Sequence, residues 1–339
     1  MGRKLISYLQ YIVFIALGLL LVWWQIHSMT DEQWVKFKAA IGNANFLLIV
    51  PVVLMSLLSH LSRGLRWKIL MEPLGYKPKL KNVFAVTMIG YLANSFVPRV
   101  GEVIKCSLLA KYENIKTDKL IGTIIIERTF DLITYGFFLI ITVLIQIDVV
   151  SDYVNKKFAA LAENSGTSIW IKIGIIISAI FLFYFIIKKL SQKYPQSIIL
   201  LKIKNFSNGI VQGFTSVKNL KDRKGFMLHT VFIWSMYLLQ IYVGFKAMDA
   251  TMGLSLKAAC AVLSLSTLAM IATPGGMGSF PLFVMETLFI YGVAEAEGFA
   301  FGWVIWGVST INIIIVGIIC LIALLKSKPI KDESFATNT

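Results

Sequence analysis

The sequence predicts an all-α integral membrane protein with six full spans and two re-entrant or broken hairpins, arranged as an inverted repeat. Three observations predict this fold. Of the 339 residues, 57% are hydrophobic and only 15% are charged, whereas an average soluble domain is about 25% charged. The apolar residues form blocks of the ~20 residues that a helix needs to cross a bilayer. Two of these blocks are interrupted by proline and glycine.

Each full span is expected on an uninterrupted apolar block. The six blocks are 5–26, 46–68, 120–147, 168–187, 226–247 and 299–325. The first block follows Met1-Gly-Arg-Lys, and no small-residue cleavage site comes after it. We therefore expect a retained span there rather than a signal peptide.

The charges between the blocks predict the orientation. The stretch 188–224 carries nine Lys or Arg against one Asp, and 63–81 carries six against one Glu. The positive-inside rule places both stretches in the cytoplasm. The more acidic stretches 148–167 and 293–298 then lie outside. We therefore expect a multi-pass protein of the cytoplasmic (inner) membrane with both termini in the cytoplasm.

The two interrupted blocks, 83–110 and 258–292, are predicted to be hairpins. Basic residues flank 83–110 on both sides, so a single crossing would place one basic flank outside. A helix that enters, breaks at Pro98–Glu102 and returns removes this conflict. The other block breaks at Pro274–Gly278 between two outer loops, so it would enter from the opposite side. The alternative is that both halves of each hairpin cross the membrane fully.

Together these elements predict a single polytopic membrane domain, 1–325, and a cytoplasmic tail, 326–339. The order span, span, hairpin, span occurs in about 1–148 and again, inverted, in about 168–325. Inverted repeats with broken helices in corresponding positions indicate a transporter's midplane binding site. This prediction follows from topology alone, because the two halves show no obvious similarity of residues.

The break in the first hairpin is the strongest candidate site. An Arg at membrane depth costs about 2.5–3.5 kcal/mol, so such residues are usually functional and paired. Arg99 and the free N–H groups of the half-helix that begins near residues 100–102 would suit a phosphate. The candidate residues are Asn94, Pro98, Arg99, Gly101, Glu102 and Lys105. The alternative is a shallow hairpin whose charged loop is solvated.

A second motif, Glu127-Arg128-Thr-Phe-Asp131, lies early in span 120–147. Glu127 and Asp131 are four residues apart and share a helix face. One interpretation is a polar gate that holds Arg99 or Lys105 until substrate arrives, with or without proton uptake. The other is a structural ion-pair lock near the inner interface, and the two interpretations are compatible.

The break in the second hairpin is rich in glycine. Its candidate residues are Pro274, Gly275, Gly276 and Gly278. Exposed backbone amides would make it a second anion-binding tip, and Ser279 is expected to cap the following helix. The alternative is that glycine serves only close helix packing.

A weaker candidate pair, Arg63 and Arg66, lies where the second span ends. We favour an interfacial anchor formed together with Trp67. The alternative is a first contact for anionic headgroups.

Other site classes are not expected. The net charge of +15 lies mostly in loops between spans, so it indicates orientation and not nucleic-acid binding. The three cysteines and three histidines are scattered, which predicts no metal site and no cofactor. No nucleophile–base arrangement is recognisable, so no catalytic residues are assigned and we expect no enzyme. The stretch 190–220 is basic and moderately apolar, which favours an amphipathic helix on the inner surface.

The motifs together resemble the transmembrane region of the lysylphosphatidylglycerol synthase family. The matching residues are Arg66-Trp67, Asn94…Pro98-Arg99-x-Gly101-Glu102, Glu127-Arg128-x-x-Asp131-Leu132 and Pro274-Gly275-Gly276-x-Gly278. The resemblance covers about residues 10–325 and implies a lipid-translocating, flippase-like domain. In the full synthase an aminoacyl-transferase domain follows, so we expect this chain to be a stand-alone form without it.

The leading hypothesis is a lipid transporter that moves an anionic or aminoacylated phospholipid, or a polyprenyl-phosphate lipid, between leaflets. The alternatives are a membrane enzyme of lipid or lipid-linked glycan modification and an accessory subunit of such an enzyme. The expected partners are therefore phospholipids or polyprenyl-phosphate lipids, a separate lipid-modifying enzyme and a second copy of the chain.

Overall fold

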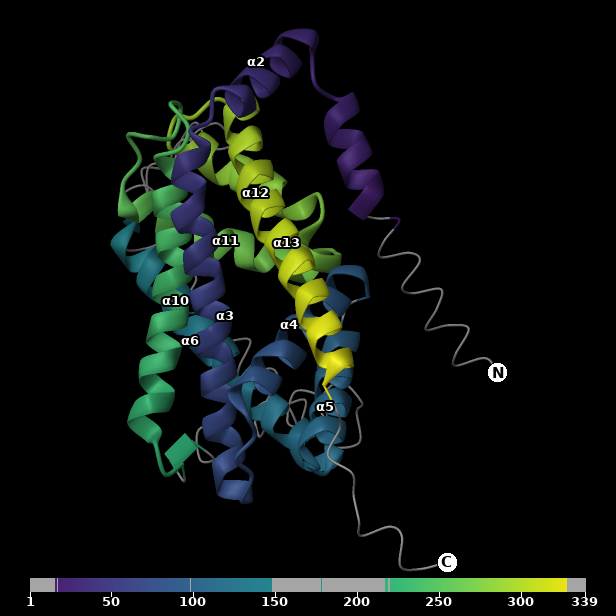
Figure 1. The fold of residues 1–339 in the computed structure, drawn as a ribbon. Helices are drawn as coiled ribbons and strands as arrows, with labels where there is room; N and C mark the ends of the chain where they lie inside the picture. Colours follow the sequence, from purple (N-terminus) through teal and green to yellow (C-terminus); the bar gives the residue numbers. More distant parts are fainter. Residues whose placement is uncertain are drawn as a thin grey trace, which may run out of the picture. The chain divides into compact units, whose positions relative to one another are not determined.

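A computed structural model describes residues 16, 18–97, 99–147, 178, 217, 218 and 220–327 of the chain. These residues form helices and connecting turns, and none of them lies in a strand, which confirms the all-α class. The elements are α2 (Asp31–Gly42), η1 (Phe46–Leu48), α3 (Ile49–Met71), η2 (Glu72–Leu74), α4 (Leu80–Phe96), α5 (Val100–Glu113), α6 (Thr117–Ile145), α10 (Arg223–Phe245), α11 (Leu256–Ala272), η3 (Pro274–Gly276), α12 (Ser279–Ile290) and α13 (Glu295–Lys326) (Figure 1).

The chain divides into two compact units. Unit 1 comprises Met1–Glu127 and Asn219–Thr339, and unit 2 comprises Arg128–Lys218. Most described helices belong to unit 1. The described part of unit 2 is mainly the later portion of α6. The predicted span 168–187 and the predicted amphipathic helix within 190–220 lie almost wholly outside the described residues.

Four long apolar helices lie on four of the predicted spans. They are Phe46–Leu74, Thr117–Ile145, Arg223–Phe245 and Glu295–Lys326, each long and apolar enough to cross a membrane. The predicted span 5–26 is described only from residue 16, and residues 18–27 are helical. The multi-pass class is therefore confirmed, while the number of spans, the repeat and the orientation stay predictions.

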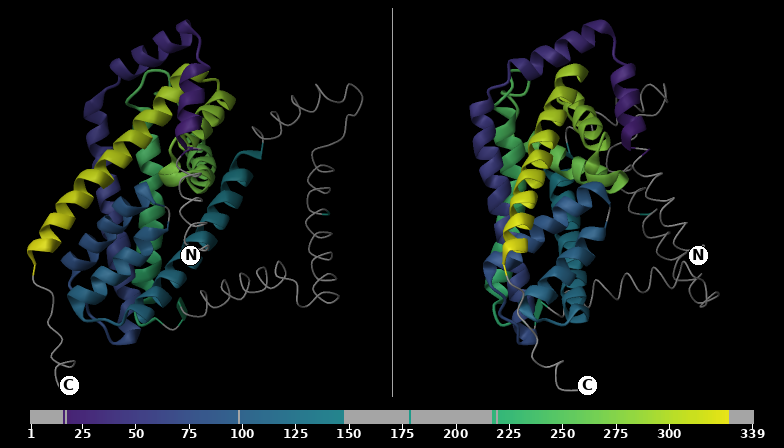
Figure 2. Two further views of the ribbon diagram at one scale, coloured as in Figure 1. Left: turned by 90° about the vertical axis from the view of Figure 1, so that its right-hand side faces the viewer. Right: turned by 45° about the vertical axis from the view of Figure 1, so that its right-hand side comes forward.

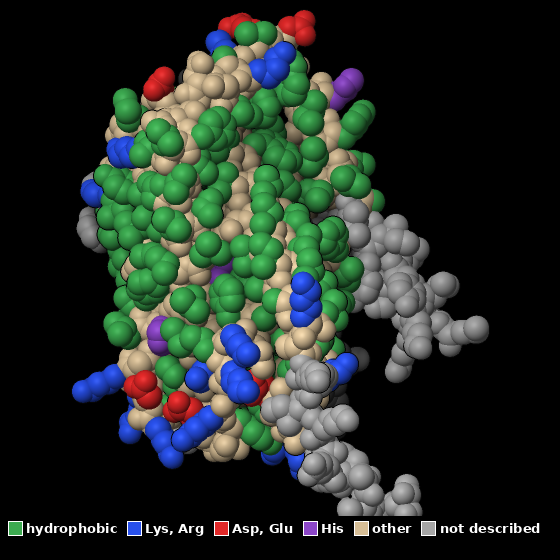
Figure 3. Space-filling view, viewed as in Figure 1, with side chains coloured by type: hydrophobic (Ala, Val, Ile, Leu, Met, Phe, Trp, Pro, Cys, Tyr) green, Lys and Arg blue, Asp and Glu red, His purple; other side chains and the backbone are tan. Residues whose placement is uncertain are grey.

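Unit 1 is held together by helices that pack along their lengths. In this unit α3 packs against α10, while α13 packs against α2, α4 and α12 (Figure 2). Large side chains fill the contacts, among them Trp67, Phe226, Phe245, Phe299 and Phe301, each 0–1% exposed. Figure 3 shows hydrophobic side chains over the middle of the visible face and most Lys and Arg near its lower end. A surface of this kind is suited to lipid acyl chains.

Both interrupted blocks fold as pairs of short helices. α4 and α5 have 17 and 14 residues, and α11 and α12 have 17 and 12. At 1.5 Å per residue each is about 18–26 Å long, which is shorter than the ~30 Å hydrocarbon core. Left-handed backbone marks the breaks, with φ 66° at Arg99 and 58°, 75° and 72° at Gly275, Gly276 and Gly278. Pro98 lies outside the described residues.

The tips of the two hairpins meet. The end of α4 contacts η3, and a Cβ added to Gly275 would lie 3.7 Å from the Cα of Ser95. The indole N–H of Trp306, on α13, donates to the Gly275 carbonyl at 2.8 Å. Breaks that are about 180 positions apart in the chain therefore share one place in unit 1.

Candidate functional site

Three basic side chains converge on one carboxylate inside unit 1. The Glu127 Oε1 atom lies 3.2 Å from Arg63 Nη1 and 3.6 Å from Arg66 Nη2. Its Oε2 atom lies 3.2 Å from Lys105 Nζ. Arg66 and Glu127 are 0% exposed, and Lys105 and Arg63 are 3% and 7% exposed. We call these four residues the cation cluster.

Neighbouring side chains fix the direction of each cation. Arg63 also donates to the Tyr237 hydroxyl at 3.1 Å, and Arg66 donates to Thr230 Oγ1 at 3.2 Å. Both partners lie on α10. Lys105 Nζ lies 4.2 Å from the centre of the Trp67 ring, a favourable cation–π distance. The cations are therefore held in place by α10 and by an aromatic ring as well as by the carboxylate.

Local sequence explains how four residues from three helices reach one place. Arg63 and Arg66 are three residues apart on α3 and share a face. α4 packs against this helix at Gly64, where an added Cβ would make an ordinary contact 3.8 Å from the Phe84 Cα. Lys105 lies on the second turn of α5, directly after the hairpin break. The early position of Glu127 on α6 then brings its carboxylate to all three cations.

The burial of the cluster makes its charges strongly interdependent. Removing an ion from water costs several kcal/mol, which is offset only by well-placed partners of opposite charge and hydrogen bonds. A buried ion pair is therefore weak evidence for added stability, but removing one partner is strongly destabilising. Two guanidinium groups and an ammonium around one anion match the chemistry that binds phosphate oxygens.

The first hairpin is closed by an asparagine bridge. Asn94 Oδ1 accepts the Gly101 N–H at 2.8 Å, and Asn94 Nδ2 donates to Glu102 Oε2 at 3.2 Å. The Gly90 and Gly101 backbones touch, so that a Cβ on Gly101 would overlap the Gly90 carbonyl and the Asn94 side chain. The prediction that this N–H stays free for a phosphate is therefore wrong at Gly101, because Asn94 occupies it.

Arg99 is not part of the cation cluster. Its side chain is exposed at the hairpin tip, and it forms no ion pair with any residue that the structure describes. Of the two predicted partners for the acidic motif, Lys105 is the one that pairs with Glu127. Arg99 is exposed on the protein surface, and its position at membrane depth stays a prediction.

Arg63 and Arg66 prove more central than expected. The favoured interpretation, an interfacial anchor with Trp67, is wrong because Arg66 and Trp67 are both 0% exposed. The Trp67 indole N–H donates to Thr123 Oγ1 at 2.8 Å inside the protein. The motif therefore belongs to the interior of unit 1.

The second hairpin is closed by hydroxyl groups. Thr273 Oγ1 donates to the Met277 carbonyl at 2.8 Å and lies 2.7 Å from Ser279 Oγ. Ser279 Oγ donates to the Ala269 carbonyl at 2.8 Å. Ser279 is therefore not the cap of α12. Gly278 holds the cap position, and the serine instead ties the two helices together. Among the described residues, no charged side chain takes part in the hydrogen bonds that close this tip.

The other predicted residues lie elsewhere along the helices. Arg128 and Asp131 follow Glu127 on α6 and belong to unit 2. Pro274 begins η3. Glu102 accepts a hydrogen bond from Asn94 and so contributes to the closure of the first hairpin. No group of three or more His, Cys, Asp or Glu that could hold a metal ion occurs within the described residues.

Sequence reasoning missed the partners on α10 and a polar stripe on α3. Ser56, His60, Arg63 and Arg66 recur at helical spacing on one apolar span and are all buried. Asn312, on α13, donates to Ser56 Oγ at 3.1 Å. The signal in the sequence was this polar periodicity inside an otherwise apolar block, which predicts a face covered by protein and not by lipid.

The comparisons with known proteins agree on one family. The family model described as the lysylphosphatidylglycerol synthase TM region matches residues 11–317. The UPF0104 membrane protein MJ1595 of Methanocaldococcus jannaschii is 24% identical over 260 residues, which cover 72% of this chain and 75% of that protein. No solved structure matches the chain with significance.

Proposed function

We propose a function from one premise: the chain belongs to the lysylphosphatidylglycerol synthase TM-region family. A membrane domain of that type fits a lipid-related function in the membrane. We propose that the chain moves a lipid with a phosphate-bearing headgroup between leaflets. The candidates are an anionic or aminoacylated phospholipid and a polyprenyl-phosphate lipid. The observation that carries the proposal is the cation cluster.

The proposed chemistry is an exchange of anions. Glu127 occupies the three cations in the closed arrangement, with its two oxygens 3.2–3.6 Å from them. An entering phosphate group presents the same kind of oxygen and fits the planar fork of arginine better than a single point charge does. The cluster is 0–7% exposed, so the headgroup enters only after the helices around it separate. The headgroup phosphate then replaces the Glu127 carboxylate as the partner of the three cations, so Glu127 acts as the gate.

The hairpins give this exchange a pathway. We infer that α4–α5 and α11–α12 are re-entrant, because each of their helices is too short to cross the hydrocarbon core and their tips meet at Ser95 and Gly275. Lys105 is rigidly linked to the first tip through α5. A movement of that tip therefore changes the distance between Lys105 and Glu127. This couples the opening of a tip to the release of the carboxylate.

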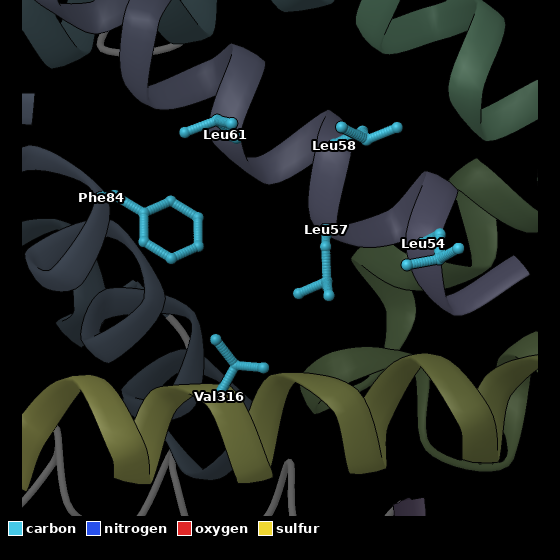
Figure 4. A pocket seen from close by; sticks show the side chains of 6 residues that line it. All are labelled: Leu54, Leu57, Leu58, Leu61, Phe84 and Val316. Atoms are coloured by element: carbon cyan, nitrogen blue, oxygen red, sulfur yellow. The ribbon is translucent and has the colours of Figure 1, made fainter. Parts of the chain in front are cut away.

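An apolar groove on the same helix suits the acyl chains. Leu54, Leu57, Leu58 and Leu61 follow one face of α3, and Phe84 and Val316 complete a cavity of about 470 Å³ (Figure 4). No polar atom lines it. The leucine face points away from Arg63, since residues 61 and 63 differ by about 200° around a helix. One helix thus offers an apolar side to lipid tails and a cationic side to headgroups.

We propose that the chain acts without catalysing a reaction. Glu127 is paired with three cations, which favours the role of a counter-ion over that of a proton donor or acceptor. The alternatives, a membrane enzyme and an accessory subunit, are separated from transport by the experiment below.

The experiment measures translocation of fluorescent phosphatidylglycerol in proteoliposomes that contain only the purified chain. Lys105→Met is the informative variant, because Glu127 keeps both arginines, and the translocation rate is counted per folded molecule. Lys111→Met, on the exposed side of the same helix, is the matched control. We expect translocation by the unmodified chain and the control, and a rate at least about tenfold lower for Lys105→Met, equivalent to ~1.4 kcal/mol of barrier.

Other outcomes would contradict the proposal. Equal rates for both variants would remove the cluster from the path. A modified lipid formed without translocation would indicate the enzyme, and activity only after a partner is added would indicate the accessory subunit.

A further inference from the structure

A second cavity, lined partly by polar side chains, lies in unit 1. It is far along the helices from the cation cluster. It has a volume of about 260 Å³ and opens between residues 18–33, α12 and the start of α13. It is at the end of unit 1 where α2 lies (Figure 1), whereas Arg66 is near the other end of α3. Its lining residues are Trp24, Gln25, Ser28, Met29, Gln33, Leu282, Met285, Glu286, Glu295, Ala296 and Phe299.

The charges in this lining are all negative. Glu286 comes from α12 and Glu295 from the first turn of α13, and no Lys, Arg or His lines the cavity. Glu295 accepts a hydrogen bond from Gln33 Nε2 at 3.3 Å. A carboxylate at the positive end of α13 is favourable, so Glu295 alone has a structural explanation. Glu286 is exposed and lies in the middle of a helix, where that explanation does not apply.

Gln25 supplies an independent sign of a missing ligand. Its side chain is 5% exposed, and its Nε2 donates to the Gly278 carbonyl at 2.9 Å. This bond fixes the orientation of the amide, because the opposite orientation would place two oxygens together. Among the described residues, none donates a hydrogen bond to the buried Oε1 atom. A buried acceptor left unsatisfied costs about 1–3 kcal/mol, which a donor bound in the cavity would remove.

The rest of the lining indicates which donor fits. Trp24, whose side chain is about half exposed, contributes an aromatic ring to the lining, and rings of this kind attract an organic cation by ~0.5–2 kcal/mol. The cavity is much larger than a water molecule needs. The described residues offer no group of three His, Cys, Asp or Glu for a metal ion. Carboxylates, an orphan carbonyl oxygen and an aromatic ring together match an alkylammonium group.

We propose that this cavity binds the ammonium group of an organic amine. The source is either the headgroup of an amine-bearing phospholipid or a free amine from solution, and the recognition chemistry is the same for both. The ammonium would lie against Glu286, donate to Gln25 Oε1 and place its carbon atoms on Trp24. This site is separate from the cation cluster, and binding at equilibrium does not require the proposed transport.

The first test measures binding of free amines to the full chain in phosphatidylglycerol nanodiscs. The probes are ethanolamine hydrochloride and methylammonium chloride, titrated against sodium chloride at equal ionic strength. We expect saturable binding of both amines, with the thermal midpoint rising as the sites fill. Glu286→Gln should weaken binding at least about tenfold. Glu32→Gln, an exposed carboxylate on α2 that pairs with Lys36 outside the cavity, is the matched control.

The second test identifies the source. Native mass spectrometry after extraction from mixed membranes counts retained phosphatidylethanolamine and phosphatidylglycerol on the unmodified chain and on Glu286→Gln. Selective loss of phosphatidylethanolamine from the variant assigns the site to a lipid headgroup, and binding of free amine alone assigns it to a soluble ligand. Both support the proposal.

Two results would overturn it. One is an equal response to the amines and to sodium. The other is unchanged amine affinity in both Glu286→Gln and Trp24→Leu while their thermal midpoints without ligand match that of the unmodified chain. Because translocation is not the readout, this failure is distinguishable from failure of the transport proposal.

Discussion

The two hairpins of unit 1 have the same outline and different chemistry. Each consists of two short helices joined at a break with left-handed backbone, and their tips touch. The α4–α5 hairpin is closed by Asn94 and carries Glu102 and Lys105. The α11–α12 hairpin is closed by the hydroxyl groups of Thr273 and Ser279. The same backbone geometry therefore occurs at a break that is linked to buried charge and at a break that is closed by hydroxyl groups.

This difference distinguishes the residues that allow the chain to turn from the residues that carry buried charge. Glycine and left-handed backbone create the break in both hairpins, so they explain why the chain can turn inside a membrane. Only the first hairpin links its break to buried charge. On the proposed function, recognition of the headgroup phosphate belongs to α4–α5, and α11–α12 supports the tip.

The largest expected effect tests the charge on the first hairpin. Glu127→Gln leaves three buried cations without their shared carboxylate, and we expect the free energy of unfolding to fall by about 3–5 kcal/mol. Titration with SDS in mixed micelles measures this loss. Asp118→Asn, exposed on the first turn of the same helix, should cost no more than about 1 kcal/mol. Equal effects of the two variants would show that the cluster is not structurally coupled.

The next effect tests the close contact inside the first hairpin. Gly101→Ala places a methyl group on the Gly90 carbonyl and the Asn94 side chain. We expect a loss of about 1–3 kcal/mol in the free energy of unfolding, because an overpacked backbone contact cannot relax fully. Gly122→Ala meets no atom within 4 Å. In the same SDS titration it should be neutral or stabilising by up to ~1 kcal/mol.

The corresponding test of the second hairpin addresses backbone strain. Gly276 has φ 75°, and its added Cβ would approach Phe280 Cβ at 3.2 Å. Gly276→Ala should lower the free energy of unfolding by about 1–2 kcal/mol, since left-handed backbone disfavours a side chain. Gly253→Ala, with open space around it and no positive φ, is the control. A stable Gly276→Ala variant would show that the break does not need glycine there.

The smallest effect tests whether the second hairpin takes part in recognition. Thr273→Val keeps the shape of the side chain and removes the hydroxyl bonds to Met277 and Ser279. We expect a loss of about 1 kcal/mol in stability and no change in phosphatidylglycerol translocation per folded molecule. A selective loss of translocation would contradict the assignment of recognition to α4–α5.

Local features of the sequence predict the helices and the breaks well. Four apolar blocks and both Pro/Gly interruptions are found where hydropathy and backbone freedom place them. The family resemblance, which rests on short motifs in order, is confirmed by the match over residues 11–317. The sequence offered Arg99 or Lys105 as partner for the acidic motif, and Lys105 pairs with Glu127. The need for such a partner follows from the high cost of an isolated charge in a membrane.

The exposure of individual arginines could not be predicted in the same way. Arg66 is buried because Thr230 and Phe226, on a helix more than 150 positions away in the chain, cover it. Arg99 is exposed at the tip of the first hairpin. Neither fact is encoded near the residue itself. Side chains at a break are easily assigned to the site by motif alone, whereas helix packing decides which of them reach it.

The length of α13 has a consequence for the surrounding bilayer. Residues 298–325 carry no charged side chain, and a helix of that length is about 42 Å long. Fitting it within ~30 Å of hydrocarbon requires a tilt of about 45°, more than twice the average for transmembrane helices, or a locally thicker membrane. A strongly inclined helix disturbs the order of neighbouring lipids. Oriented-sample spectroscopy of α13 would therefore report whether the protein disorders the bilayer around it.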